Sequence, residues 1–176
     1  MSASAESNVP LAPLRTVQII VMAMCAGCVA SGAVAVLLHR TLADTSPKSQ
    51  PAAWVTMIAV AYAASMLPVG FLLPAWLTSG QIRRVSVQAA GSEDPNRDAA
   101  WLAKAFVTET IIGAALVEGA ALFGSVAYLV EGDTLSLAAG GVMLAVLIGR
   151  FPTQNRLTGW LTARLQQLKE ARLFGG

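Results

Sequence analysis

Charged side chains are scarce in this sequence. Lys, Arg, Asp and Glu make up 12% of its 176 residues, against roughly 25% in an average soluble domain. Apolar residues make up 55%, and the mean hydropathy is +0.61. Such a composition is typical of an integral membrane protein and unlike that of a soluble globular domain.

The residues on which soluble enzymes rely are also few. His39 is the single histidine, and the two cysteines, Cys25 and Cys28, lie in an uncharged apolar stretch without a nearby histidine. The C-x-x-C spacing would suggest a redox or metal site in a soluble protein, but these surroundings favour small-residue packing. The sequence contains no Ser-His-acid set, Walker loop or HExxH pattern. We expect no catalytic residue, metal site, cofactor or enzymatic activity, and at most a non-catalytic part in ion translocation.

The sequence does contain four apolar blocks separated by polar segments. Residues 16–38 and 53–77 are uncharged over 23 and 25 residues, which exceeds the roughly 20 residues that a helix needs to cross a bilayer. The charged residues of the third block, 105–130, are two glutamates. The fourth block, 135–150, is short, so a helix over it can cross the bilayer only if the helix is little tilted or the bilayer is locally thinner. We expect an all-α, multi-pass membrane protein whose four transmembrane helices occupy residues 16–151.

Basic residues divide unevenly between the two sides that four spans define. The N-terminal tail, the loop 78–104 and the segment from Arg150 onward share one side and hold ten Lys and Arg, whereas Arg40 and Lys48 lie on the other. The positive-inside rule then predicts a cell inner membrane protein with both termini and the loop in the cytoplasm. The net charge of +2 comes from this asymmetry and gives no indication of nucleic acid binding.

The segments outside the spans have distinct compositions. Residues 1–15 are rich in Ser, Ala, Pro and Asn and are predicted to form a flexible tail. Residues 152–176 carry leucines at spacings of mostly three and four with basic residues among them. This pattern predicts an amphipathic basic helix that lies on the membrane surface or docks on a partner. Within the second span, Pro68 and Pro74 remove two backbone donors and predict a kink or local unwinding.

The stretch IIGAALVEGAALFGSVAYLVEG (111–132), which overlaps most of the third block, carries a glutamate near its middle. Glu118 is 13 residues from Ala105, or about 20 Å along a helix, which places it near the bilayer centre. Glu109 is only about 6 Å from the same end and about 180° around the helix, so the two acids cannot form a pair. An acid at the depth of Glu118 is costly and indicates either a function or a buried hydrogen bond.

The helix face of Glu118 supports both of these interpretations. Ser125 lies on the same face and could share a hydrogen bond or coordinate an ion, so Glu118 and Ser125 form the candidate site for a proton or Na⁺. Small residues on this helix would allow another helix to approach closely; those predicted to do so are Gly113, Ala114, Ala115 and Gly119.

Residues 111–124, IIGAALVEGAALFG, resemble the ion-binding helix of the rotor-ring c subunit, the proteolipid of F-type ATP synthases. The shared pattern is a glycine among small residues, then Leu-x-Glu, then small residues and an aromatic-Gly step. The second and third spans, joined by a polar loop, are also similar to that family's helical hairpin. The second span, however, has one glycine and two prolines in place of the family's glycine repeat, and two further spans are present.

The resemblance implies that Glu118 takes up and releases a proton or Na⁺ during ion translocation. The implied partners are the lipid bilayer and further copies of the chain or other subunits of a membrane complex. The alternative is a non-transporting scaffold or accessory subunit in which Glu118 joins helices by a hydrogen bond. A third interpretation is a small solute transporter or channel that uses the kinked second span.

Overall fold

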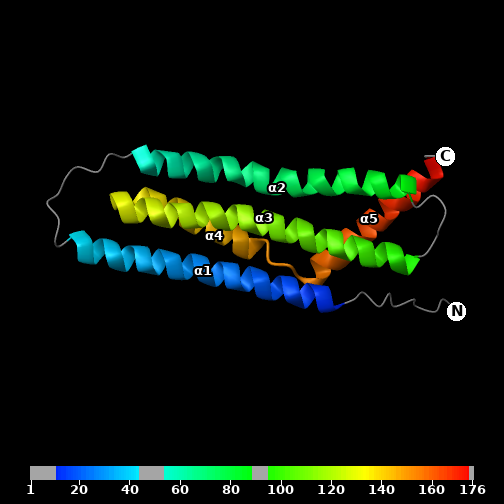
Figure 1. Cartoon of the computed structure of the whole chain (residues 1–176), viewed down its shortest axis with the longest axis horizontal. Helices are drawn as coiled ribbons and strands as arrows, with labels where there is room; N and C mark the ends of the chain where they lie inside the picture. Colours follow the sequence, from blue (N-terminus) through cyan, green and yellow to red (C-terminus); the bar gives the residue numbers. More distant parts are fainter. Residues whose placement is uncertain (1–10, 44–53, 89–94, 175–176) are drawn as a thin grey trace.

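The computed structural model describes residues 11–43, 54–88 and 95–174, and these residues form five helices (Figure 1). They are α1 (Leu11–Ala43), α2 (Trp54–Gln88), α3 (Pro95–Glu131), α4 (Thr134–Gly149) and α5 (Gln154–Phe174). No strand occurs in the described part of the chain. The predicted all-α class is confirmed.

Helix α3 forms the centre of the bundle. It packs against α1, α2 and α4, and its first turns also contact α5. At one end of the bundle α1 stops, α2 starts and α3 turns back into α4; we call this the hairpin end (Figure 1). At the opposite end α1 and α3 start, α2 stops and α5 lies across them; we call this the α5 end.

Three of the helices are long and apolar enough to cross a membrane. The candidate spans are Leu14–Leu42, Trp54–Leu73 and Ala100–Glu131. Helix α4 has only 16 residues and is bent by 69° against the start of α5. A fourth crossing exists only if this bent pair is one span, so the membrane character of the chain is confirmed and the fourth span stays a prediction.

The helices extend further than the apolar blocks. Helix α1 begins at Leu11, within the predicted tail 1–15, and both α2 and α3 run well into the segment 78–104 that hydropathy assigned to a loop. Hydropathy marks the apolar part of a helix, whereas the backbone hydrogen bonds that define the helix continue into polar sequence. Residues 1–10 and 89–94 of these predicted segments lie outside the described residues.

A tight turn joins α3 to α4 at the hairpin end. Gly132 has a φ of +70° and donates its N–H to the carbonyl of Tyr128 at 2.7 Å, which is the left-handed helix stop that glycine adopts without strain. Asp133 then caps α4 by accepting the N–H of Leu135 at 2.9 Å. The two helices leave this turn so close together that a Cβ on Gly124 would lie 2.8 Å from the carbonyl oxygen of Ser136.

Helix α5 packs its apolar face on the chain itself. Leu157 and Leu161 are buried in a cluster with Leu14 of α1 and with Leu102 and Phe106 of α3. Among the described residues, this part of the apolar face predicted over 152–176 covers the ends of α1 and α3. A position of the helix on the membrane surface or on a partner stays a prediction. The four residues 150–153 join α4 to α5, and the bend of 69° between the two helices lays α5 across the end of the bundle.

Candidate functional site

Glu118 lies at the contact between α3 and α1. Its side chain is half-buried, and Oε1 is 3.7 Å from the position that a Cβ on Gly27 would occupy. The absence of a side chain at Gly27 therefore leaves the space beside the carboxylate. Cys25 and Cys28 lie on either side of this glycine in α1, and both thiols are near enough to Glu118 to interact with its charge.

The carboxylate of Glu118 has few polar neighbours. Among the residues that the structure describes, none donates a hydrogen bond to Glu118 or forms an ion pair with it. Its neighbours Cys28 of α1 and Val117 and Ala121 of α3 belong to the apolar core of the bundle. A carboxylate in such surroundings is stabilised by a group that brings a proton or a positive charge.

The depth of Glu118 follows from the aromatic residues of α2. Trp54 and Trp76 are both exposed, at 61% and 72%, and are about 33 Å apart along the helix, close to the thickness of the hydrocarbon core. Tryptophan favours the two membrane interfaces. Glu118 is 13 residues from Glu131 at the hairpin end, or about 20 Å, and so lies inside this apolar layer.

Ser125 shares the side of α3 that faces α1 but does not join Glu118 in one site. Its Oγ is 3.8 Å from the position of a Cβ on Gly32 and donates to the carbonyl of Ala121 at 3.3 Å. The hydroxyl hydrogen is thus used within α3. Seven residues separate Ser125 from Glu118, which corresponds to about 10 Å along the axis, so the structure places the two on one face at different depths.

The four predicted packing residues lie in different surroundings. Gly113 and Ala114 are buried at helix contacts. Ala115 is exposed, and no atom lies within 4 Å of the position of a Cβ on Gly119. In a single copy of the chain, only the first two are covered by neighbouring helices.

Sequence reasoning missed the role of Arg150, the residue at which α4 ends. Its Nη1 donates to the carbonyl of Gly70 in α2 at 2.7 Å, and its guanidinium lies over the ring of Phe71 at 4.3 Å. Nη2 is 3.0 Å from the position of a Cβ on Gly113. The signal in the sequence was Pro74, because a proline leaves the carbonyl four residues earlier, here that of Gly70, without its helical donor.

Glu131 is the second residue whose role the sequence analysis did not identify. Its carboxylate at the end of α3 accepts the backbone N–H groups of Val55 and Thr56, at 2.8 and 2.7 Å. These are among the first N–H groups of α2, which have no partner within their own helix. The sequence has alanine at position 53, where a capping residue would stand, and this missing cap was the available signal.

The described residues contain no group of three or more His, Cys, Asp and Glu that could hold a metal ion. No protein-family model, curated protein or solved structure matches this chain.

Proposed function

We propose that this chain is a membrane subunit of an ion-translocating assembly, in which Glu118 binds and releases a proton or Na⁺. The observation that carries the proposal is a carboxylate inside the apolar layer that faces Gly27 of α1 and accepts no hydrogen bond from the described residues. An acid held in this way can exchange a cation without first breaking a helix contact.

The same observation weighs against a purely structural acid. If Glu118 joined helices in the manner of a polar residue in a membrane bundle, it would exchange a hydrogen bond with a side chain or carbonyl of α1. The residues of α1 beside it are Gly27 and the two cysteines, Cys25 and Cys28. The space that Gly27 leaves beside the carboxylate therefore favours an exchangeable proton or ion over a tight polar contact.

The resemblance to the c subunit of F-type ATP synthases adds support over residues 111–124. One difference bears on the path of the ion. Helix α3 is surrounded by α1, α2 and α4 of the same chain, whereas that family builds its subunit from a single hairpin. In this chain we infer that the ion reaches Glu118 from the side of α3 that faces Gly27 of α1.

The assembly and its orientation are part of the proposal. Ala115 is exposed on α3, and Gly119 has open space beside it, so this strip suits close contact with a helix of another copy or another subunit. Ten of the twelve basic residues belong to the segments at the α5 end. The positive-inside rule then assigns this end and both termini to the cytoplasmic side of an inner membrane.

Carbodiimide labelling tests the proposed site directly. Carbodiimides modify protonated carboxyl groups that are accessible from the lipid, so Glu118 is expected to react in membranes at neutral pH. High pH should slow the reaction for a proton site, and Na⁺ should protect a sodium site. Glu131, which accepts two hydrogen bonds, serves as the internal control. A Glu118 that reacts no faster than Glu131 would count decisively against the site.

Ion flux in proteoliposomes tests the function. Glu118→Gln keeps the size and polarity of the side chain but cannot titrate, so the protein should assemble normally and lose flux. The matched control is Glu109→Gln, which removes an acid from the same helix about 13 Å away along the axis and should retain flux. If Glu118→Gln retained both assembly and flux, the scaffold interpretation would replace this one.

A further inference from the structure

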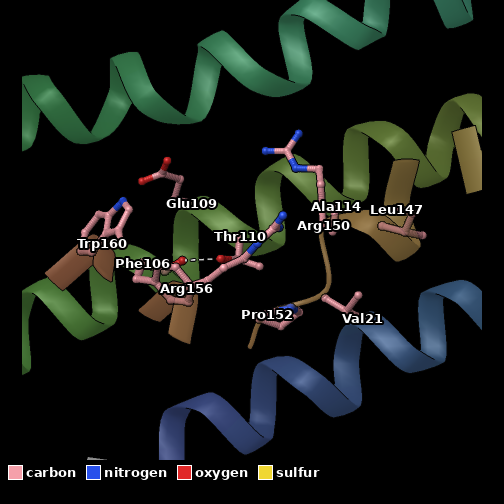
Figure 2. A pocket seen from close by; sticks show the side chains of 10 residues that line it. All are labelled: Val21, Phe106, Glu109, Thr110, Ala114, Leu147, Arg150, Pro152, Arg156 and Trp160. Carbon is pink, nitrogen blue, oxygen red and sulfur yellow. Dashed lines mark hydrogen bonds between the residues drawn. The ribbon is translucent and has the colours of Figure 1, made fainter. Parts of the chain in front are cut away.

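A small pocket opens where α4 ends and α5 begins. It has a volume of about 140 Å³ and lies between α1, α3 and the connecting segment 150–153 (Figure 2). Four polar residues line it, Glu109 and Thr110 from α3, and Arg150 and Arg156 from the two sides of the bend. The ring of Trp160 forms one of its walls.

The charges around the pocket favour a ligand with one negative charge. Two guanidinium groups and one carboxylate line it, which gives a formal net charge of +1. Arg150 interacts electrostatically with both Glu109 and Arg156, and its guanidinium is turned toward Gly70 of α2. A singly charged anion balances this lining, whereas a doubly charged anion is disfavoured by the carboxylate of Glu109.

The charged hydrogen-bond donors of the pocket are those of arginine. Thr110 already donates its hydroxyl hydrogen to the carbonyl of Phe106 at 2.8 Å (Figure 2). Arg150 uses Nη1 for the carbonyl of Gly70, but a guanidinium carries five N–H groups in all. The planar N–H groups of arginine match the oxygens of a phosphate group in pairs.

The pocket lies toward the α5 end of the candidate span Ala100–Glu131. Glu109 is 22 residues from Glu131, or about 33 Å along α3, which is close to the thickness of the hydrocarbon core. Trp160 adds an aromatic side chain of the kind that favours the membrane interface. A phosphate group at this level can belong to a lipid whose acyl chains stay in the bilayer.

We propose that this pocket binds the phosphodiester group of a membrane phospholipid, held by the guanidinium groups of Arg150 and Arg156. The phosphodiester carries one negative charge and so matches the net charge of the lining. Inorganic phosphate, of which a large part is doubly charged at neutral pH, provides the same chemistry from a soluble source but fits the lining less well. The site is separate from Glu118 and does not depend on its proposed role.

Native mass spectrometry of the delipidated full-length protein in detergent provides the test. The probe is dioleoyl-phosphatidylglycerol, and the comparators are dioleoylglycerol, which lacks the phosphate, and inorganic phosphate. We expect one phosphatidylglycerol per chain to bind at least tenfold more tightly than dioleoylglycerol. Arg156→Gln should weaken this binding about tenfold, since it removes a charged hydrogen bond. Arg156 is the better position to change, because Arg150 also holds Gly70.

Two controls separate the pocket from general charge. Lys104→Gln removes one positive charge from an exposed position near the start of α3 and should change the affinity less than twofold. Glu109→Gln raises the net charge of the lining to +2 and should let inorganic phosphate compete. Equal binding of dioleoylglycerol, or equal losses in Arg156→Gln and Lys104→Gln, would overturn the site. Competition by inorganic phosphate in the unmodified protein would overturn the assignment to a lipid.

Discussion

Arg150 donates a hydrogen bond from Nη1 to the backbone carbonyl of Gly70 at 2.7 Å, across 80 residues of sequence. In an unbroken helix this carbonyl would accept the N–H of residue 74, but residue 74 is a proline and has none. Helix α2 nevertheless continues through this position. The side chain at the end of α4 thus satisfies the carbonyl that the proline of α2 leaves open.

The effect of this contact on stability can be measured as a double-mutant cycle. Arg150→Met should lower the free energy of unfolding in mixed micelles by about 1.5–3 kcal/mol, the range for hydrogen bonds to charged groups. Pro74→Ala restores a backbone donor for the Gly70 carbonyl. In that background Arg150→Met should cost less, with a coupling of about 1 kcal/mol between the two positions. Equal costs in both backgrounds would show that the proline and the arginine act independently.

Two glycines of α3 offer a matched pair for testing the close packing around Arg150. A Cβ on Gly113 would lie 3.0 Å from Nη2 of Arg150 and 3.3 Å from the carbonyl oxygen of Gly70. Gly113→Ala should therefore destabilise the protein by about 1–3 kcal/mol. Gly119→Ala meets no atom within 4 Å and should stabilise the helix by up to about 1 kcal/mol. If the unfolding curves of the two variants coincided, this assignment of the contacts would be wrong.

The helices and their membrane character could be predicted because they depend on local composition. A run of more than twenty apolar residues satisfies its backbone within one helix and its side chains in lipid, whatever the rest of the chain does. The depth of Glu118 follows in the same way, from counting residues along α3. The ends of the helices could not be predicted from hydropathy, because α2 and α3 continue into polar sequence where the apolar signal has stopped.

The contacts between distant residues depend on how the helices are placed side by side. Pro74 predicts that the Gly70 carbonyl needs a donor, but nothing local indicates that Arg150, 80 residues away, supplies it. Glu131 similarly carries no motif, and its role appears only when the end of α3 lies beside the start of α2. The position of Glu118 beside Gly27 could not be predicted either, because the spacing of residues identifies a face of α3 but not the helix that covers this face.

Helix α5 should detach when its buried face is weakened. Leu157 is only 2% exposed and packs with Leu102 and Phe106 of α3. Leu157→Ala removes these apolar contacts, and in a closed core such a loss lowers the free energy of unfolding by about 2–4 kcal/mol. Hydrogen exchange of residues 154–167 should accelerate, while the amides of α3 in the apolar layer stay protected. Thr158→Ala, at the exposed neighbouring position, should leave the exchange unchanged. Equal protection in both variants would mean that lipid and not α3 holds the helix in place.

The two hydrogen bonds that the carboxylate of Glu131 accepts can be tested separately. Oε1 accepts the N–H of Val55 and Oε2 accepts that of Thr56. Glu131→Gln keeps one acceptor oxygen and replaces the other by an NH₂ group, which cannot accept. One of the two amides should therefore exchange about tenfold faster, and Glu131→Ala should accelerate both. Asp133→Asn is the matched control, because Asp133 accepts from Leu135 in α4 and should leave Val55 and Thr56 unchanged. Equal exchange at Val55 and Thr56 in all three variants would show that the start of α2 is held by something other than the end of α3.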